Sequence, residues 1–172
     1  MSNSSAKTAT VLGAEYMREL ESEVRATREC LKAVPLNDPK WKPHEKSMEL
    51  GYLAILVADI PRWIEYAIDK GEVDFKTYPQ AKAETADELV AHFDKSVEGA
   101  KRALAAVSDE RLKETFYLKN DGQELMKAPI DETVMSSINH MVHHRGQLSV
   151  YMRLLDVPIP SIYGPSADSR GF

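Results

Sequence analysis

The sequence has very little cysteine and no excess of positive charge. Cys30 is the one cysteine among 172 residues, so the chain cannot form an internal disulfide, and a disulfide-stapled scaffold is excluded. Lysine and arginine number 22 against 27 for aspartate and glutamate, and the formal net charge at pH 7 is -5. Proteins that bind nucleic acid need a basic surface that neutralises phosphates. We therefore expect no nucleic-acid partner.

Long apolar runs are also missing. The most apolar stretch, residues 50–68, is interrupted by Asp59, Pro61 and Arg62, so it lacks the character of a membrane span. Residues 1–8 lack the apolar centre of a secretion signal. We predict a cytoplasmic protein that does not interact with membranes and that begins with a flexible N-terminus over residues 1–8.

What the sequence does contain is typical of one compact domain. Hydrophobic residues make up 43% and charged residues 28%, which is ordinary for globular proteins and unlike disordered or fibrous chains. Apolar residues recur at helical spacing in four stretches, separated by clusters of proline, glycine and asparagine. The pattern predicts an all-α four-helix domain spanning residues 1–172, with helices near residues 10–32, 47–69, 85–106 and 131–155.

Capping patterns predict where three of these helices begin. Ser47 is the expected N-cap of the second helix. Thr85 and Glu88 have the spacing of a capping box at the start of the third helix. Pro129 and Asp131 are expected to cap the fourth helix.

The segments between the predicted helices indicate their connectivity. Residues 33–46 and 69–84 are too long for tight antiparallel turns, so we expect at least one crossover between non-adjacent helices. Residues 115–127 contain two short extended stretches around Asn-Asp-Gly, a pattern typical of a small hairpin or an extended loop. We expect residues 157–172 to pack on the bundle as a C-terminal tail.

Three of the five histidines lie together in the fourth predicted helix, at His140, His143 and His144. His140 and His144 are four residues apart, so both imidazoles share one helix face and can converge on one metal ion, whereas His143 points elsewhere. Two ligands are too few for a tight site, so another element must supply a further donor. The alternative is that the pair consists of partly buried, hydrogen-bonded side chains.

Several neighbours of the histidines have both a functional and a structural interpretation. Arg145 and Gln147 are candidate hydrogen-bond partners of the pair, or else a solvated arginine and an interhelical contact. Tyr151 is a candidate pocket residue or part of the core. Gly146 is costly inside a helix, which suggests that another helix or chain approaches it closely. For His92, a solvent-facing position is the expected one.

The sequence around the histidines closely resembles the DinB/YfiT-like family of bacterial four-helix proteins. The resemblance extends upstream to about residue 10, and it implies a bundle with crossover topology, frequent homodimers and a divalent metal held by three histidines. Some members of this family are transferases or isomerases that use low-molecular-weight thiols. The motifs that carry the resemblance are His140-Met-Val-His143-His144-Arg145-Gly146-Gln147, Tyr151-Met-Arg153-Leu154, Tyr163-Gly-Pro-Ser-Ala-Asp168, Lys42-Pro-His44, Leu53-Ala54 and Ile60-Pro-Arg-Trp63.

Carried over to this chain, the resemblance implies that His140 and His144 are two of the three metal ligands. The family's third histidine belongs three residues after Leu53, where this chain has Leu56. A leucine has no lone pair to donate. Asp59, one turn further along, is the first candidate for a substitute. We therefore expect a divalent metal, zinc or nickel, to bind weakly or not at all.

Two functional hypotheses follow. In the first, the chain has an altered metal site and acts on a small molecule or thiol, for example as a metal-dependent transferase. In the second, it is a non-catalytic, dimeric binding or interaction module that has lost the metal centre. The retained histidine pair favours the first hypothesis, and Leu56 favours the second.

Overall fold

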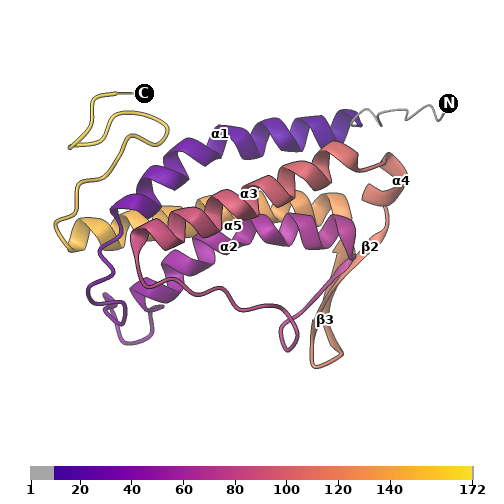
Figure 1. Cartoon of the computed structure of the whole chain (residues 1–172), viewed down its shortest axis with the longest axis horizontal. Helices are drawn as coiled ribbons and strands as arrows, with labels where there is room; N and C mark the ends of the chain where they lie inside the picture. Colours follow the sequence, from indigo (N-terminus) through magenta and orange to yellow (C-terminus); the bar gives the residue numbers. More distant parts are fainter. Residues whose placement is uncertain (1–9, 172) are drawn as a thin grey trace.

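The computed structural model describes residues 10–171, and it is mostly helical with a small sheet (Figure 1). The four long helices match the predicted ranges closely, because their apolar residues recur at helical spacing. The predicted flexible segment, residues 1–8, lies outside the described residues. The elements in chain order are α1 (Val11–Ala33), α2 (Leu50–Asp69), β1 (Glu72–Asp74), α3 (Ala86–Ala106), α4 (Asp109–Leu112), β2 (Thr115–Asn120), β3 (Gln123–Pro129) and α5 (Ile130–Leu154).

The predicted cap of α3 is present, whereas the predicted cap of α2 is wrong. The Thr85 hydroxyl accepts a hydrogen bond from the Glu88 amide, 3.2 Å away. Helix α2 begins at Leu50, after Glu49, and no side chain caps it. Its first amides instead donate to carbonyl groups of the preceding connection: Leu50 N lies 2.8 Å from Trp41 O, and Gly51 N lies 2.8 Å from Pro39 O. A capping hydroxyl at residue 47 is therefore not needed.

The start of α5 differs from its prediction in the same way. Pro129 occupies the N-cap position and makes no side-chain cap bond, and Asp131 lies inside the first turn, where its carboxylate accepts from the Glu132 amide. An acidic residue at this position still stabilises the positive end of the helix.

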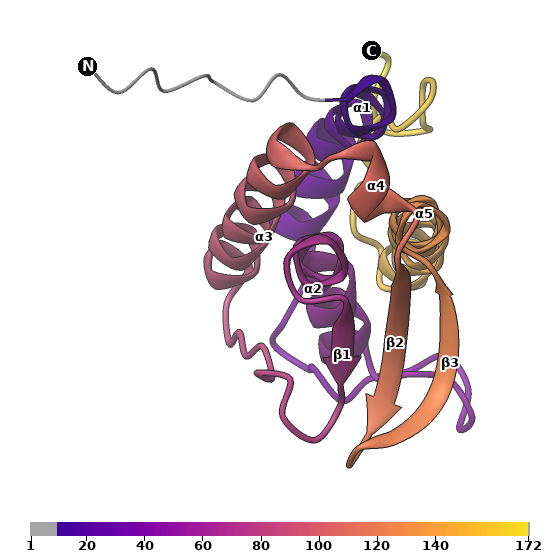
Figure 2. The same ribbon diagram turned by 90° about the vertical axis from the view of Figure 1, so that its right-hand side faces the viewer.

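Helix α2 lies at the centre of the packing, between α3 and α5 (Figure 2). Helix α1 packs against α3 and α5 and barely touches α2, its neighbour in sequence, so the chain crosses over as the long connections predicted. Each fully buried aliphatic or aromatic side chain contributes about 1.5–3 kcal/mol. Fully buried members of this core include Leu53, Val57, Ile60, Phe93, Leu104, Met141 and Leu148.

The small sheet has the strand order β1-β2-β3. The hairpin interpretation of residues 115–127 holds: β2 and β3 pair antiparallel, and Asp121 and Gly122 form the turn with positive φ values of 52° and 77°. Strand β1 was not predicted. It pairs parallel with β2 over three residues and buries one apolar side chain, Val73. Three residues are too few to show the alternating pattern of a strand. The all-α prediction therefore needs this sheet added.

The C-terminal segment, residues 157–171, lies along one end of α1 and α5 without regular secondary structure (Figure 1). Val157, Ile159 and Ile162 pack against the core. Separately, no helix within residues 10–171 is long and apolar enough to cross a bilayer.

Candidate functional site

His140 and His144 converge on α5. Their Nε2 atoms lie 2.7 Å apart, and the ring centroids are 4.5 Å apart. The four-residue spacing brings both rings to one helix face. His144 is buried, His140 is half-buried and His143 is exposed. The two candidate ligands are thus together, and the third histidine of the cluster is the one most open to solvent.

Gln147 holds the outer nitrogen of His144. The Gln147 side-chain oxygen lies 2.7 Å from His144 Nδ1. An amide oxygen only accepts, so Nδ1 of His144 carries the proton and its Nε2 has the lone pair. His140 Nε2 then donates to His144 Nε2, and the lone pair of neutral His140 is on Nδ1. Of the proposed partners of the histidine pair, Gln147 is in place.

His140 also lines a cavity of about 300 Å³ between α2, the β2–β3 hairpin and α5. The indole ring of Trp63 lies beside the imidazole ring of His140, and the centroids of the two rings are 6.3 Å apart. Burial lowers the pKa of His140 to about 4, and the neighbouring His144 and His143 add to the effect. His140 is therefore neutral at pH 7. The other walls of the cavity are formed by Phe116, Met126, Ala128, Glu132, Thr133, Ser136 and Ser137.

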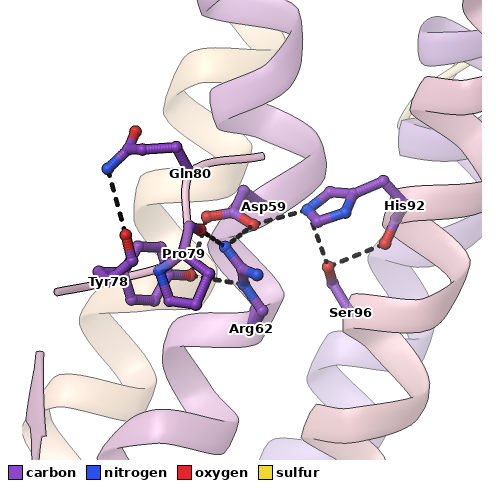
Figure 3. A network of polar contacts seen from close by, with 7 residues as sticks. All are labelled: Asp59, Arg62, Tyr78, Pro79, Gln80, His92 and Ser96. Atoms are coloured by element: carbon purple, nitrogen blue, oxygen red, sulfur yellow. Dashed lines mark hydrogen bonds and ion pairs between the residues drawn. The ribbon is translucent and has the colours of Figure 1, made fainter. Parts of the chain in front are cut away.

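Leu56 and Asp59 do not complete a metal site. Leu56 is half-buried and lines a separate cavity of about 160 Å³. Both carboxylate oxygens of Asp59 are engaged elsewhere: Tyr78 donates to one at 2.8 Å, and Arg62 and His92 contact the other at 2.8 and 2.6 Å (Figure 3). Asp59 as the substitute ligand is therefore a wrong expectation, because a full set of partners already holds its carboxylate.

The donor set does not fit the family's three-histidine centre. Within residues 10–171, no group of three or more histidine, cysteine, aspartate or glutamate side chains is placed to hold one metal ion. Two imidazoles alone leave at least two positions of a tetrahedral ion without protein ligands. The convergence of His140 and His144 is explained by their hydrogen bond as it stands.

Arg145 does not contact the histidine pair. It is 1% exposed, and its guanidinium donates to Glu23 Oε2 at 2.5 Å and to Thr27 Oγ1 at 2.9 Å, both on α1. The Tyr163 hydroxyl of the C-terminal segment lies 2.9 Å from Arg145 and 2.9 Å from the other carboxylate oxygen of Glu23. The proposed role beside the histidines is wrong for Arg145, whose guanidinium joins α5, α1 and the tail.

Tyr151 is a packing residue. It is 8% exposed, its ring lies 5.5 Å from that of Trp41 in an edge-on arrangement, and its hydroxyl donates to the Met48 carbonyl at 3.3 Å. It lines neither the His140 cavity nor the Leu56 cavity. Gly146 is exposed, and apart from its chain neighbours and the adjacent backbone of α5 no atom of the described chain lies within 4 Å of where its Cβ would be. Close approach by another helix of this chain therefore does not explain Gly146.

The sequence pattern does not predict the network around Asp59. His92 is half-buried and bonded to Asp59, so the expected solvent-facing position is wrong. Burial and the Asp59 charge raise the pKa of Tyr78, which keeps its hydroxyl protonated as a donor to Asp59. A signal was available: an aspartate within the apolar stripe of α2 must be buried, and a buried carboxylate requires partners.

The sequence matches the model described as the DinB family over residues 1–170. Solved structures with a similar fold include the DinB-like protein YjoA of Bacillus subtilis, with 20% identity and a TM-score of 0.65, covering 91% of this chain and 99% of that one. A DinB-like protein of Bacillus cereus has 20% identity and a TM-score of 0.65, covering 87% and 97% of the two chains. A protein of Exiguobacterium sibiricum described as a DinB-family member has 19% identity and a TM-score of 0.62, covering 86% and 94%.

At these identities the structural likeness concerns the fold alone. No curated protein matches the sequence. The family match nevertheless covers nearly the whole chain and agrees with the motifs around His140 and His144. The chain belongs to the DinB family.

Proposed function

We propose that this chain binds a small, mainly apolar molecule in the cavity beside His140 and that this binding does not use the three-histidine metal centre of the family. The observation that carries the proposal is the placement of a neutral imidazole against Trp63 in a cavity of about 300 Å³. A concave site with mostly apolar walls and a few placed polar groups is the usual form of a small-molecule pocket.

The polar groups of this cavity favour a ligand that donates a hydrogen bond. Within residues 10–171, His140 Nδ1 makes no hydrogen bond. Every buried side-chain nitrogen or oxygen in that range has a hydrogen-bond partner. Because Nδ1 has none, it is not buried and reaches solvent. Because its Nε2 donates to His144, Nδ1 is an acceptor. An alcohol or thiol group meets this requirement, and the apolar part of such a ligand would contact Trp63 and Phe116.

The second candidate is a metal-dependent transferase of the kind that the family resemblance suggests. The convergence of the His140 and His144 Nε2 atoms favours it, as does the Gln147 contact to His144. The missing third donor weighs against it. We infer that zinc or nickel binds much more weakly here than to a three-histidine site.

Binding of matched ligands tests the leading proposal. The ¹H–¹⁵N spectrum, with the Trp63 indole signal assigned, is recorded during titration with benzyl alcohol and with toluene, which lacks the hydroxyl group, in metal-free buffer. We expect saturable shifts of the Trp63 signal, with benzyl alcohol bound more tightly. His140→Phe should remove this preference, and Ser136→Trp should fill the cavity and abolish both responses. Tyr151→Phe, outside the cavity, is the matched control.

A Trp63 signal that does not respond to either compound contradicts the proposal. The same holds if Ser136→Trp leaves the shifts unchanged, because the compounds would then bind elsewhere. If binding appears when zinc is added and not before, the metal-dependent candidate replaces it.

A further inference from the structure

We propose a second ligand site, centred on His92, that takes a small molecule carrying both a hydroxyl hydrogen and an anionic oxygen. It is a cavity of about 380 Å³ between α2, α3 and the connection around residues 80–82. It lies apart from the His140 cavity and shares no lining residue with it. The proposal therefore stands independently of the function proposed above.

The imidazole of His92 is held with one nitrogen directed at a carboxylate. Its Nε2 lies 2.6 Å from Asp59 Oδ1 (Figure 3). A carboxylate only accepts, so Nε2 carries the proton. Within residues 10–171, Nδ1 of His92 makes no hydrogen bond, and no buried side-chain nitrogen or oxygen is without a partner. Nδ1 therefore meets solvent, and on the neutral ring it is a hydrogen-bond acceptor.

The residue behind His92 is itself rigidly placed. Asp59 is 6% exposed, receives hydrogen bonds from Tyr78 and His92, and forms an ion pair with Arg62. Arg62 in turn donates to the Tyr78 hydroxyl at 2.8 Å and to the Pro79 carbonyl at 2.5 Å. Because Asp59 is held in place, it fixes the orientation of the His92 ring. The Nδ1 atom of His92 is therefore presented to a ligand at little entropic cost.

The charges around the cavity provide the second contact. Arg62 is paired with Asp59, and Arg102 with Glu65. Lys82 and Lys95 also line the cavity, and neither has an ion-pair partner within 4 Å in the described part of the chain. Glu98 is the remaining carboxylate of the lining. The cavity thus has an excess of positive charge in a chain whose net charge is -5, which favours an anionic ligand.

One face of α3 forms a wall of this cavity. His92, Lys95, Ser96, Gly99 and Arg102 fall at helical spacing on one face of α3, and all of them line the cavity. A Cβ at residue 99 would clash with the Glu65 carboxylate, so glycine lets Glu65 lie against α3. Glu65 can then pair with Arg102 at the cavity wall.

Together these groups define the ligand. The hydroxyl hydrogen donates to His92 Nδ1, and the anionic oxygen binds Lys95 and Lys82. A hydroxycarboxylate and a protonated phosphate both meet this description. Sulfate carries the charge without the proton, and a simple carboxylate carries the charge without the hydroxyl group.

Pairs of probes that differ in the hydroxyl hydrogen test the site. The ring-nitrogen resonances of His92 are followed by ¹⁵N NMR at pH 7 and constant ionic strength, with inorganic phosphate against sulfate and with lactate against propionate. We expect phosphate, lactate or both to shift Nδ1 of His92 with saturation, and the probe without the hydrogen to leave it unchanged. Which pair responds distinguishes a phosphate ligand from a hydroxycarboxylate.

Variants link the response to the cavity. Lys95→Gln removes a charged hydrogen bond to the anionic oxygen, and it should weaken binding of the responding probe about tenfold, which equals about 1.4 kcal/mol. Lys127→Gln, an equal charge change on β3, should leave the affinity unchanged. Lys95 is exposed, so its variant should fold normally. The proposal is overturned if sulfate shifts the His92 signal as strongly as phosphate and propionate as strongly as lactate, or if none of the four probes shifts it. It is also overturned if Lys95→Gln and Lys127→Gln change the affinity for the probe equally.

Discussion

Arg145 and Glu23 form an ion pair across 122 positions of sequence, with Arg145 Nη1 2.5 Å from Glu23 Oε2 and both side chains almost completely buried. Thr27 and Tyr163 contact the same pair. This cluster ties the middle of α5 to α1 and to the C-terminal segment, and it is the most buried charged group of the fold.

Loss of one member of this pair should be costly. Arg145→Met leaves the Glu23 carboxylate buried without its counter-charge, which typically costs about 3–5 kcal/mol of unfolding free energy. Urea unfolding monitored by circular dichroism measures this loss. The double variant Arg145→Met with Glu23→Leu should recover a large part of the lost stability, because it leaves no unpaired charge buried. Equal instability of the single and double variants would contradict this account.

The tail contact is a smaller and separate contribution. Tyr163→Phe removes the hydroxyl that bonds Arg145 and Glu23, and we expect a loss of about 0.5–1.5 kcal/mol in unfolding free energy. The tail should also become more sensitive to limited proteolysis. Tyr52→Phe is the matched control, since Tyr52 is 61% exposed. A tail that is cleaved at the same rate in both variants would argue that Tyr163 does not hold it.

His140 should make stability depend on pH. Its pKa falls from the ordinary 6.5 to about 4, mainly because burial disfavours the charged ring. Between pH 6.5 and pH 4 the unfolded chain therefore binds a proton at His140 that the folded chain does not bind. The contribution of neutral His140 to the unfolding free energy is fully present above pH 6.5 and is lost as the pH falls toward 4. Urea unfolding of wild type and His140→Gln from pH 4 to 7 should give a smaller slope for the variant. Parallel profiles would show that His140 is not the titrating group.

Restoring the third donor should restore metal affinity. If residue 56 lies at the third corner of the family site, Leu56→His should raise zinc affinity by orders of magnitude over wild type, as measured by competition with a chelator. His144→Ala in the same background should cancel the gain. Leu56→Gln controls for polarity at that position. Tight stoichiometric zinc binding by wild type would show that another residue replaces the histidine.

Gly146 leads to a prediction about self-association. The residue is exposed and nothing in the described chain covers it, although glycine costs a helix about 0.5–1 kcal/mol relative to alanine. We expect a twofold homodimer with this face of α5 at the contact. Light scattering at high micromolar concentration should give twice the 19.3 kDa chain mass, and Gly146→Trp should shift it to monomer. A wild-type monomer would remove the prediction.

The long helices and the histidine pair could be predicted because each depends on local spacing. Leu89 through Leu104 repeat at helical intervals, and His140 and His144 need only one turn of helix to meet. The partners of Arg145 and Asp59 could not be predicted in this way. Glu23 lies 122 positions from Arg145, and His92 lies 33 positions from Asp59. These contacts depend on which helix faces pack together, and periodicity within one helix does not specify that.

Trp63 forms a wall of both the His140 cavity and the smaller cavity beside Leu56. One indole ring on α2 therefore partitions two neighbouring spaces. A smaller side chain at residue 63 should therefore enlarge both cavities at once, a coupling that no other residue lining the His140 cavity provides.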